Sequence, residues 1–439
     1  MVYGIDLGTT NSLIGNGDKL FSGLVSSNVD IKKKQQVERD EVSPDIVASY
    51  KTDMSIGADG QEAVVCSSII LRELADQASK QTNEVVKYVI VSVPAYFSTS
   101  QREAVNKAAD MAGLDVKCLI NEPTAASLYV CRDMKDLIVV YDLGGGTFDI
   151  TIIDARAGNY TVIATDGCVL GGDDLDNALV EEVIKVAGIP IRYRNAANKK
   201  RLKNMMRHAK ENLQTMRSDV LVDLADFGIE MKYTLSIERY KQIVKDVFWE
   251  TIRRTQYVIS NNLPASEEPK IIFVGGSTNC PYLKEMVLDA LGIEEVIGDC
   301  APDLTVAKGV ALYAEMYEQG IAFDIVDDVT KRLCIEDSFG KTITLIDGNT
   351  IIPASGNVVV TNSTADSILR LRLYQGDSAI AAKNAYIGTL EYDYGRVMEV
   401  DSGIVKVTAN VTRDGIIKLA AEQLLLGAVS YQEIQLQSR

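Results

Sequence analysis

The chain has 439 residues, and this length predicts roughly two to three domains rather than one hydrophobic core. Its composition, 46% apolar and 24% charged, is typical of a globular protein, and the formal net charge of −16 argues against a general affinity for nucleic acid or anionic lipid. No apolar run reaches membrane-spanning length and residue 1 leads straight into a predicted strand, so we expect a cytoplasmic protein without signal peptide or membrane anchor.

Cysteine and histidine content excludes zinc. The seven cysteines are scattered and form no C-x-x-C pair, and His208 is the only histidine. A zinc site is therefore not expected. The cysteines are interpreted as small apolar residues in a reducing compartment, and His208 as a structural residue of a helical stretch.

One segment occurs twice in altered form. Residues 5–12 read IDLGTTNS and residues 141–149 read YDLGGGTFD. Each is an apolar run, an Asp, a glycine-containing turn and a second apolar run, which predicts a β-hairpin. Backbone N–H groups at such a turn suit a polyphosphate, and an Asp at a strand end suits a hydrated divalent metal. One copy alone is compatible with a simple strand and turn, but the repetition favours a duplicated domain that holds one nucleotide from both sides.

Strands and helices alternate between the two hairpins. Predicted helices cover about 64–80, 100–113 (with Ser100 as the N-cap) and 124–131, and predicted strands cover 88–93 and 117–120. This alternation predicts an α/β domain with a central sheet.

Two features after the second hairpin have more than one interpretation. Gly171 and Gly172 open a helix, where they either approach phosphate through their backbone or simply begin the helix. Residues 192–210 carry eight Lys and Arg and no acid. We interpret this run as a solvated helix face with one or two cations turned toward a nucleotide, in preference to a nucleic-acid site.

Further along the chain, a helix at 237–262 carries the only tryptophan, Trp249, and is interpreted as a packing element. A buried strand at 271–274 runs into Gly275, Gly276 and Ser277, a third place where backbone can approach a ligand. Helices follow at about 281–291 and 307–317.

Beyond residue 320 only short alternating segments with glycine turns remain, which predicts an antiparallel β domain of about 110 residues, a sandwich. We therefore expect domains at 1–320 and 331–439 joined by a linker at 321–330.

Taken together, these motifs resemble the Hsp70 (DnaK-type) chaperone family over nearly the whole chain. The motifs that carry the resemblance are GIDLGTTNS at 4–12, VSVPAYF at 91–97, NEPTAAS at 121–127, DLGGGTFD at 142–149 and VGGST at 274–278. Actins and sugar kinases share the folding plan but not the second and third motifs. The resemblance implies an α/β actin-like ATPase domain, duplicated and ribonuclease H-like, followed by a C-terminal antiparallel β-sandwich that binds peptides.

The resemblance also implies roles for individual residues. Asp6 and Asp142 would hold Mg²⁺ through water, and the resemblance is compatible with K⁺ as a further bound ion. The implied catalytic residues are Asp6, Glu122, Asp142, Thr147 and Asp149. The implied contacts with ATP or ADP are Gly8, Thr9, Thr10, Asn11, Gly144, Gly145, Gly146, Thr147, Gly171, Gly172, Lys210, Gln214, Gly275, Gly276, Ser277, Asn279 and Asp303.

Several departures from the family pattern weaken the expected activity. The chain is shortened between Gly57 and Leu71, and no residue matches the lysine that in relatives reaches the γ-phosphate. Loss of such a cation predicts slow hydrolysis. Asn279 replaces an arginine, Glu211 replaces a cation of some relatives, and Cys118 replaces a basic residue, which argues against stimulation by a J-protein.

The resemblance assigns further residues to peptide binding and to communication. Ile335, Val360, Leu369 and Leu371 would line a slot for one extended client peptide, or else belong to the sandwich core. Pro94 and Arg102 match the pair that relays nucleotide state between domains, and a nucleotide-exchange factor is a partner that relatives use. No helical lid follows the last strand, so fast peptide exchange is expected.

These observations lead to a compact, lidless Hsp70-like chaperone that hydrolyses ATP slowly and binds neither nucleic acid nor membrane. The alternative is a scaffold that binds ATP without cleaving it and serves one client or assembly. A small-molecule kinase on the same fold is disfavoured by the β domain.

Overall fold

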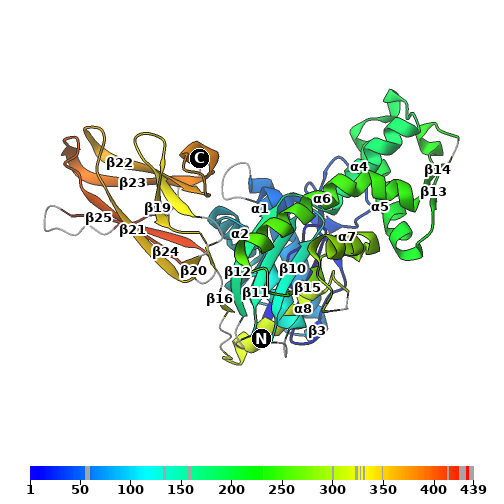
Figure 1. Cartoon of the computed structure of the whole chain (residues 1–439), viewed down its shortest axis with the longest axis horizontal. Coiled ribbons are helices and arrows are strands. Elements are labelled where there is room, and N and C mark those ends of the chain that lie inside the picture. The colour runs from blue at the N-terminus through cyan, green and yellow to red at the C-terminus, as the bar shows by residue number, and fades with distance from the viewer. Residues whose placement is uncertain are drawn as a thin grey trace.

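The computed structural model is a mixed α/β structure with several sheets (Figure 1). It describes residues 1–54, 60–131, 135–156, 160–230, 232–298, 301–321, 325–326, 328–329, 332–348, 350–412, 415–424 and 432–434. Among these residues, no helix is sufficiently long and apolar to cross a membrane.

The first hairpin lies at the centre of one sheet, whose strand order is β3-β2-β1-β8-β9, with β4 also paired to β2. The bounds are β1 Val2–Asp6, β2 Asn11–Asn16, β3 Lys19–Leu20, β4 Val25–Ser26, β8 Tyr88–Val93 and β9 Asp115–Asn121. Strand β1 pairs antiparallel with β2 and parallel with β8. Helices α1 (Gln61–Thr82) and α2 (Thr99–Ala112) bury their apolar residues against this sheet in one hydrophobic cluster.

The second hairpin lies at the centre of another sheet, with the order β15-β10-β11-β12-β16. The bounds are β10 Leu137–Leu143, β11 Phe148–Asp154, β12 Tyr160–Cys168, β15 Lys270–Val274 and β16 Ile325–Val326. Here β10 pairs antiparallel with β11 and parallel with β15. Each hairpin therefore has the same neighbours in the same directions, which supports the inference that the two halves repeat one plan.

Helices α3 (Glu122–Val130) and α8 (Thr305–Glu318) join the two halves. They share a hydrophobic cluster with Ile90 of β8 in one half and Val140 of β10 in the other. Their packing is close, because a Cβ on Gly309 would lie 1.8 Å from the Ala125 carbonyl oxygen. The hairpin turns are thus held at a fixed separation.

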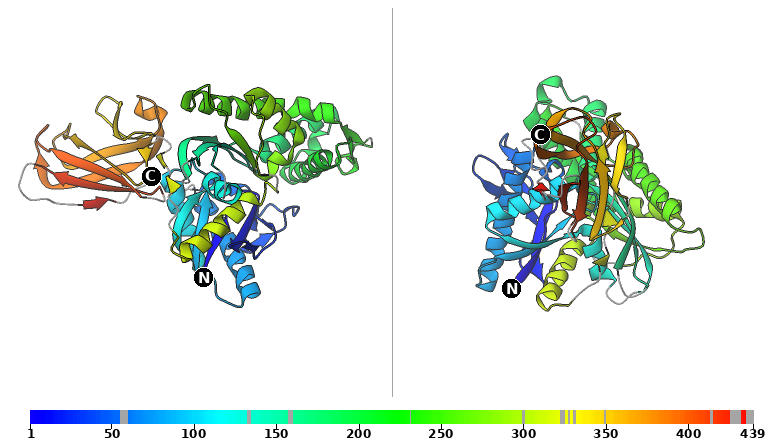
Figure 2. Two further views of the ribbon diagram at one scale, coloured as in Figure 1. Left: turned by 60° about the horizontal axis from the view of Figure 1, so that its bottom comes forward. Right: turned by 90° about the vertical axis from the view of Figure 1, so that its left-hand side faces the viewer.

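Additional elements extend each half (Figure 2). One half carries a small sheet of β5 (Asn28–Asp30), β6 (Gln35–Val37) and β7 (Ile46–Val47) and the 3-10 helix η1 (Tyr50–Asp53). The other carries α4 Gly172–Val186, η3 Ile191–Tyr193, α5 Ala196–Met216, β13 Val220–Val222, η4 Ala225–Phe227, β14 Tyr233–Leu235, α6 Ile237–Asn262, η5 Gly276–Asn279 and α7 Pro281–Leu291.

The remaining strands form two four-stranded antiparallel sheets, β19-β18-β22-β23 and β21-β24-β25-β26. Their bounds are β18 Leu333–Glu336, β19 Thr342–Ile346, β21 Ala354–Val360, β22 Asp366–Gln375, β23 Ala385–Met398, β24 Val405–Val411, β25 Ile417–Gln423 and β26 Gln432–Ile434. The short strands β17 (Asp328–Val329) and β20 (Thr350–Ile351) pair with each other, and η6 covers Ala381–Lys383. One hydrophobic cluster contains residues of both large sheets.

The β part contacts the rest of the chain in two ways. Strand β16 pairs parallel with the edge strand β12, so the predicted linker continues the second sheet. The Thr99 hydroxyl donates to the Gly415 carbonyl oxygen at 3.4 Å.

Helix α2 begins two residues earlier than the predicted cap implies, because Ser98 is the N-cap: its hydroxyl accepts the Gln101 N–H, and the Gln101 side chain accepts the Ser98 N–H. Ser100 is therefore not the cap.

Candidate nucleotide site

The turns of the two hairpins face each other at close range. A Cβ on Gly145 would lie 1.9 Å from the Thr10 hydroxyl oxygen, and one on Gly146 would lie 2.9 Å from a Thr9 methyl carbon. Any other residue at position 145 would force the Thr10 side chain to move. Between the turns, and extending toward α5 and the turn after β15, lies a cavity of about 540 Å³.

Most of the residues predicted to contact nucleotide line this cavity. They are Asp6, Gly8, Thr9, Thr10, Asn11, Glu122, Asp142, Gly144, Gly145, Thr147, Gly172, Lys210, Gln214, Gly275, Gly276, Ser277, Asn279 and Asp303. Gly146, Gly171 and Asp149 are not in its wall. Asp149 lies on β11 directly across the hairpin from Asp142 and is buried.

Three carboxylates, Asp6, Glu122 and Asp142, line the floor of the cavity, and Asp149 lies buried behind them. Burial, followed by the charge of Glu122, raises the pKa of Asp6 to about 6, while the Ser92 hydroxyl, 2.9 Å from its oxygen, opposes this rise. The same two causes raise the pKa values of Asp142 and Asp149 well above the usual range, and the Tyr96 backbone amide partly offsets the effect at Asp149. A buried group of like charges is stabilised by a cation placed among them.

The structure provides such a cation, which corrects the sequence analysis. Lys51, on the 3-10 helix η1, points into the cavity and forms an ion pair with Glu122. Its side chain is only 4% exposed, and its charge lowers the pKa values of Asp6, Asp142 and Asp149. No residue was matched to the family's phosphate lysine in the sequence, yet a lysine does lie in this cavity. Lys51 precedes the shortened stretch, so the shortening did not remove it.

The cluster of four carboxylates also suits a hydrated metal ion. Within the described parts of the chain, no cluster of three or more His, Cys, Asp and Glu side chains is arranged to hold a metal directly. However, both oxygens of buried Asp149 lack a hydrogen bond of ordinary geometry to the described residues. The single positive charge of Lys51 also neutralises only one of the four carboxylates. The donor set, all oxygen, is the kind that Mg²⁺ binds through its water shell.

The N–H groups of the two glycines at the start of α4 form hydrogen bonds within the protein. The Gly171 N–H donates to the Asp174 carboxylate at 2.8 Å, and the Gly172 and Asp173 N–H groups donate to the Gly144 and Gly145 carbonyl oxygens at 3.0 and 2.7 Å. These N–H groups are already used, so the geometry favours the helix-start interpretation over a phosphate contact. Gly172 still borders the cavity.

The opposite end of the cavity is lined by α5 and the turn after β15. Lys210 is buried and pairs with Asp176 at 2.6 Å, and the Gln214 amide donates to the Tyr240 hydroxyl at 2.9 Å. The Ser277 hydroxyl donates to the Gly144 carbonyl oxygen at 2.8 Å. The inward position of Lys210 agrees with the interpretation of residues 192–210, in which one or two cations turn inward.

A second cation of the cavity was also missed. Arg39 lines it and reaches across from the small sheet to pair with Glu211 of α5 at 3.2 Å. Neighbouring Asp40 pairs with Arg207 and, at 3.0 Å, with His208. The sequence shows no hydrophobic periodicity around Arg39, because this segment forms only short strands and a loop. Glu211 was the sole sign in the sequence that a cation would lie next to position 211.

The remaining predicted residues lie elsewhere. Arg102 is buried and donates to the Asn121 side-chain oxygen at 2.7 Å and to the Phe97 and Ala95 carbonyl oxygens. Pro94 directly follows β8. A Cβ on Gly415 would lie 3.0 Å from the Arg102 Nε atom. Arg102 is thus at the contact between the β part and the rest of the chain.

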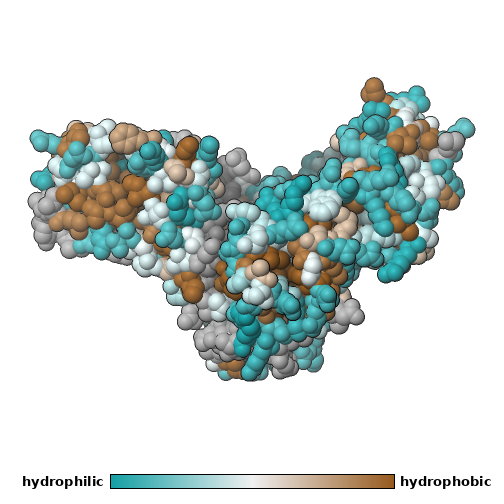
Figure 3. All heavy atoms as spheres, in the orientation of Figure 1, coloured by the Kyte–Doolittle hydropathy of each residue, from teal (hydrophilic) through white to brown (hydrophobic). Residues whose placement is uncertain are grey.

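The four residues predicted for the peptide slot belong to the hydrophobic core of the β part. Ile335, Leu369 and Leu371 are buried, and Val360 packs against the same cluster. Of the two interpretations left open, the geometry favours the core one, and a role in the slot stays a prediction. Figure 3 shows apolar side chains gathered on the visible face of the β part.

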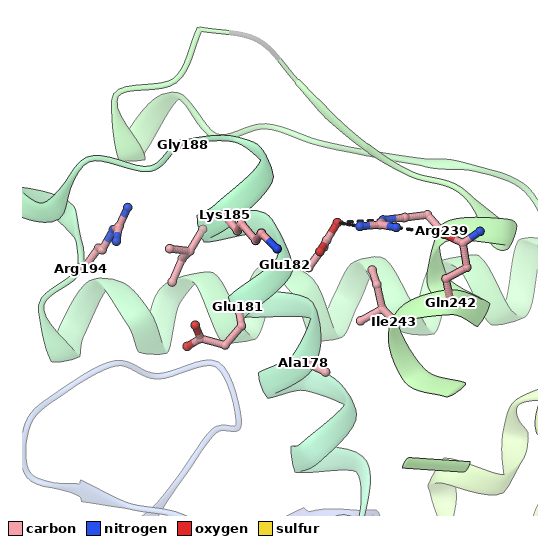
Figure 4. Close-up of a pocket in the computed structure, with 10 residues that line it drawn as sticks. Ala178, Glu181, Glu182, Lys185, Gly188, Arg194, Arg239, Gln242 and Ile243 are labelled. Atoms are coloured by element: carbon pink, nitrogen blue, oxygen red, sulfur yellow. Dashed lines mark hydrogen bonds and ion pairs between the residues drawn. The ribbon is translucent and has the colours of Figure 1, made fainter. Parts of the chain in front are cut away.

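A larger cavity, of about 760 Å³, lies between α4 and α6, away from both hairpin turns (Figure 4). There Glu182 of α4 and Arg239 of α6 point toward each other and form an ion pair. None of the predicted nucleotide residues lines this cavity, so the smaller one is the candidate nucleotide site.

Comparison with known protein families gives one match over most of the chain. The family described as "Hsp70 protein" matches residues 31–439.

Proposed function

Because the chain belongs to the Hsp70 family, we propose that it is an ATP-dependent chaperone that cleaves ATP in the cavity between the hairpins and uses the nucleotide state to control a peptide-binding β domain. The nucleotide domain comprises residues 1–320 and has the actin-like, ribonuclease H-like plan. The linker comprises 321–330, and the β-sandwich domain comprises 331–439.

One observation carries the ATPase part of this proposal. A buried lysine, Lys51, lies among four carboxylates, and the turns of the two hairpins face each other across the same cavity. Phosphoryl transfer needs positioning and neutralisation of charge rather than covalent help from the protein. Asp6 and Asp142 would hold hydrated Mg²⁺, which when bound neutralises charge on the phosphates. Lys51 faces the phosphate end, and Glu122, Thr147 and Asp149 orient the attacking water.

Lys51 also changes the balance between the candidate functions. The scaffold that binds ATP without cleaving it was supported by two features, a missing lysine in the nucleotide site and the lack of apolar arch residues over the peptide slot. Lys51 in the cavity answers the first of these, and this favours turnover of ATP.

Two contacts support coupling between the domains. The linker strand β16 extends the sheet that contains the second hairpin, and Gly415 of the β domain lies against Arg102. Arg102 is in turn bound to Asn121, the residue before Glu122. A change at Glu122 on ATP binding thus has a short path of direct contacts to the β domain.

The test is ATP-triggered release of peptide. A fluorescent extended apolar peptide is bound to the full chain, and its anisotropy is followed after addition of Mg²⁺ and ATP. We expect ATP to accelerate release at least about tenfold, which corresponds to about 1.4 kcal/mol. Arg102→Gln should bind ATP normally but lose this acceleration. Equal release rates with and without ATP in the parent would contradict the proposal.

A further inference from the structure

A second cavity, of about 650 Å³, lies beside the nucleotide cavity, between the small sheet and helices α4 and α5. It is rich in cations, and all of them except Arg39 lie outside the wall of the nucleotide cavity. Its wall contains five cationic side chains, Arg39, Lys199, Lys200, Lys203 and Arg207, and two carboxylates, Asp173 and Glu181. The protein as a whole is strongly acidic, so this local excess of positive charge is a specific feature of the cavity.

Not all of these cations are neutralised by neighbours. Lys203 pairs with Asp173 at 2.6 Å, whereas Lys199 and Lys200 form no ion pair within the described parts of the chain. Burial, followed by the charge of Lys203, lowers the pKa of Lys200. A half-buried lysine close to a second one is stabilised when an anion binds between them.

The two cavities adjoin at the phosphate end. Thr9, Thr10, Arg39 and Asp173 line both. Thr9 and Thr10 are in the turn of the first hairpin, where the phosphates of a bound nucleotide are expected. Asp173 accepts hydrogen bonds from Ser49 of one half and Lys203 of the other. An anion that leaves the phosphate end therefore has this basic cavity as its neighbour.

We propose that the second cavity is a binding site for orthophosphate, which receives the phosphate cleaved from ATP before it leaves the protein. This inference rests on the proposed function. In the cleavage step, water adds to the γ-phosphorus and the bond from that phosphorus to the bridging oxygen breaks, giving ADP, orthophosphate and a proton. Lys199 and Lys200 then bind the phosphate oxygens through charge-assisted hydrogen bonds.

Equilibrium dialysis with radiolabelled orthophosphate tests the site directly. The full chain is first saturated with Mg²⁺ and a non-hydrolysable ATP analogue, so that the γ-phosphate position is filled. The parent should bind one equivalent of orthophosphate. Lys199→Gln combined with Lys200→Gln should weaken this binding at least about tenfold, as expected for loss of hydrogen bonds to a charged group, and added salt should also weaken it.

Arg201→Gln combined with Lys245→Gln is the matched control, since both residues are exposed, neither lines the cavity and the charge change is the same. It should keep the parent's affinity for orthophosphate. Equal weakening in both double variants, or no bound orthophosphate in the parent, would overturn the site. Displacement of a fluorescent nucleotide by the analogue is measured separately: if no nucleotide binds, the proposed function fails, whatever the dialysis shows.

Discussion

At the scale of single residues, Lys51 and its carboxylate neighbours dominate the chemistry. An ion pair this deeply buried contributes little net stability, yet loss of one partner leaves a buried charge without compensation. Lys51 was not predicted because the family resemblance placed the expected lysine in the shortened stretch, and only the folded chain shows that η1 brings a lysine to Glu122. The carboxylates, by contrast, were identified from motifs in which Asp ends a strand.

Lys51→Met should lower the free energy of unfolding by about 3 kcal/mol, because Glu122 then remains buried without its partner. Combining it with Glu122→Gln should restore much of that loss. Urea unfolding at neutral pH without nucleotide measures both. The control Lys80→Met removes an exposed lysine of α1 and should change little. If the double variant is no more stable than Lys51→Met, the ion pair is not the cause.

The raised pKa of Asp6 predicts a pH dependence of stability. The folded state keeps this proton up to about pH 6, whereas an unfolded Asp loses it near 3.9. Folded protein therefore binds more protons between these values, and this group's contribution to stability falls as pH rises through that window. Without Mg²⁺ and nucleotide, Asp6→Asn should gain stability relative to the parent as pH rises from about 4 to 7. A difference that does not vary with pH would contradict the assignment.

At the scale of elements, the two glycine turns and the start of α4 form one packed unit. The sequence predicted both hairpins and the helix at residue 172, because strong apolar runs and glycines mark them locally. It left the role of Gly171 open, since its contact with the second hairpin depends on tertiary packing: a Cβ there would lie 2.7 Å from the Gly145 backbone.

Gly171→Ala should accordingly displace α4 from the second hairpin and weaken nucleotide binding at least about tenfold, with a loss of stability of about 1–3 kcal/mol, because overpacking against backbone forces a shift. Gly23→Ala is the control, since a Cβ on Gly23 would have no other atom within 4 Å. Thermal unfolding and titration with a fluorescent nucleotide measure the two effects. Unchanged affinity in Gly171→Ala would show that the turn tolerates a shift of α4.

At the scale of the whole molecule, the repeat of the two hairpins could be recognised in the sequence because the motif is local, and the change to short strands beyond residue 320 was equally visible. The contacts between segments far apart in the chain could not be predicted. Arg39 with Glu211 and Asp40 with Arg207 join segments far apart in the chain, as does the pairing of β16 with β12. Such pairs leave no periodic signal.

The same distinction applies to the peptide slot. Its four predicted residues are apolar residues of three strands, β18, β21 and β22, which fits a binding surface and a core equally well, and only burial distinguishes the two. Ile335, Leu369 and Leu371 are buried among residues of both sheets.

Single-turnover cleavage of ATP tests the central claim most directly, namely that the two hairpins, their carboxylates and Lys51 form a working ATPase site. Enzyme in excess over radiolabelled ATP and Mg²⁺ is quenched over time, and ADP is separated from ATP. We predict complete cleavage in the parent, with a rate lowered at least about 100-fold in Lys51→Met, the size expected for loss of one preorganised stabilising group. No cleavage by the parent over hours, although ATP is bound, would contradict the claim.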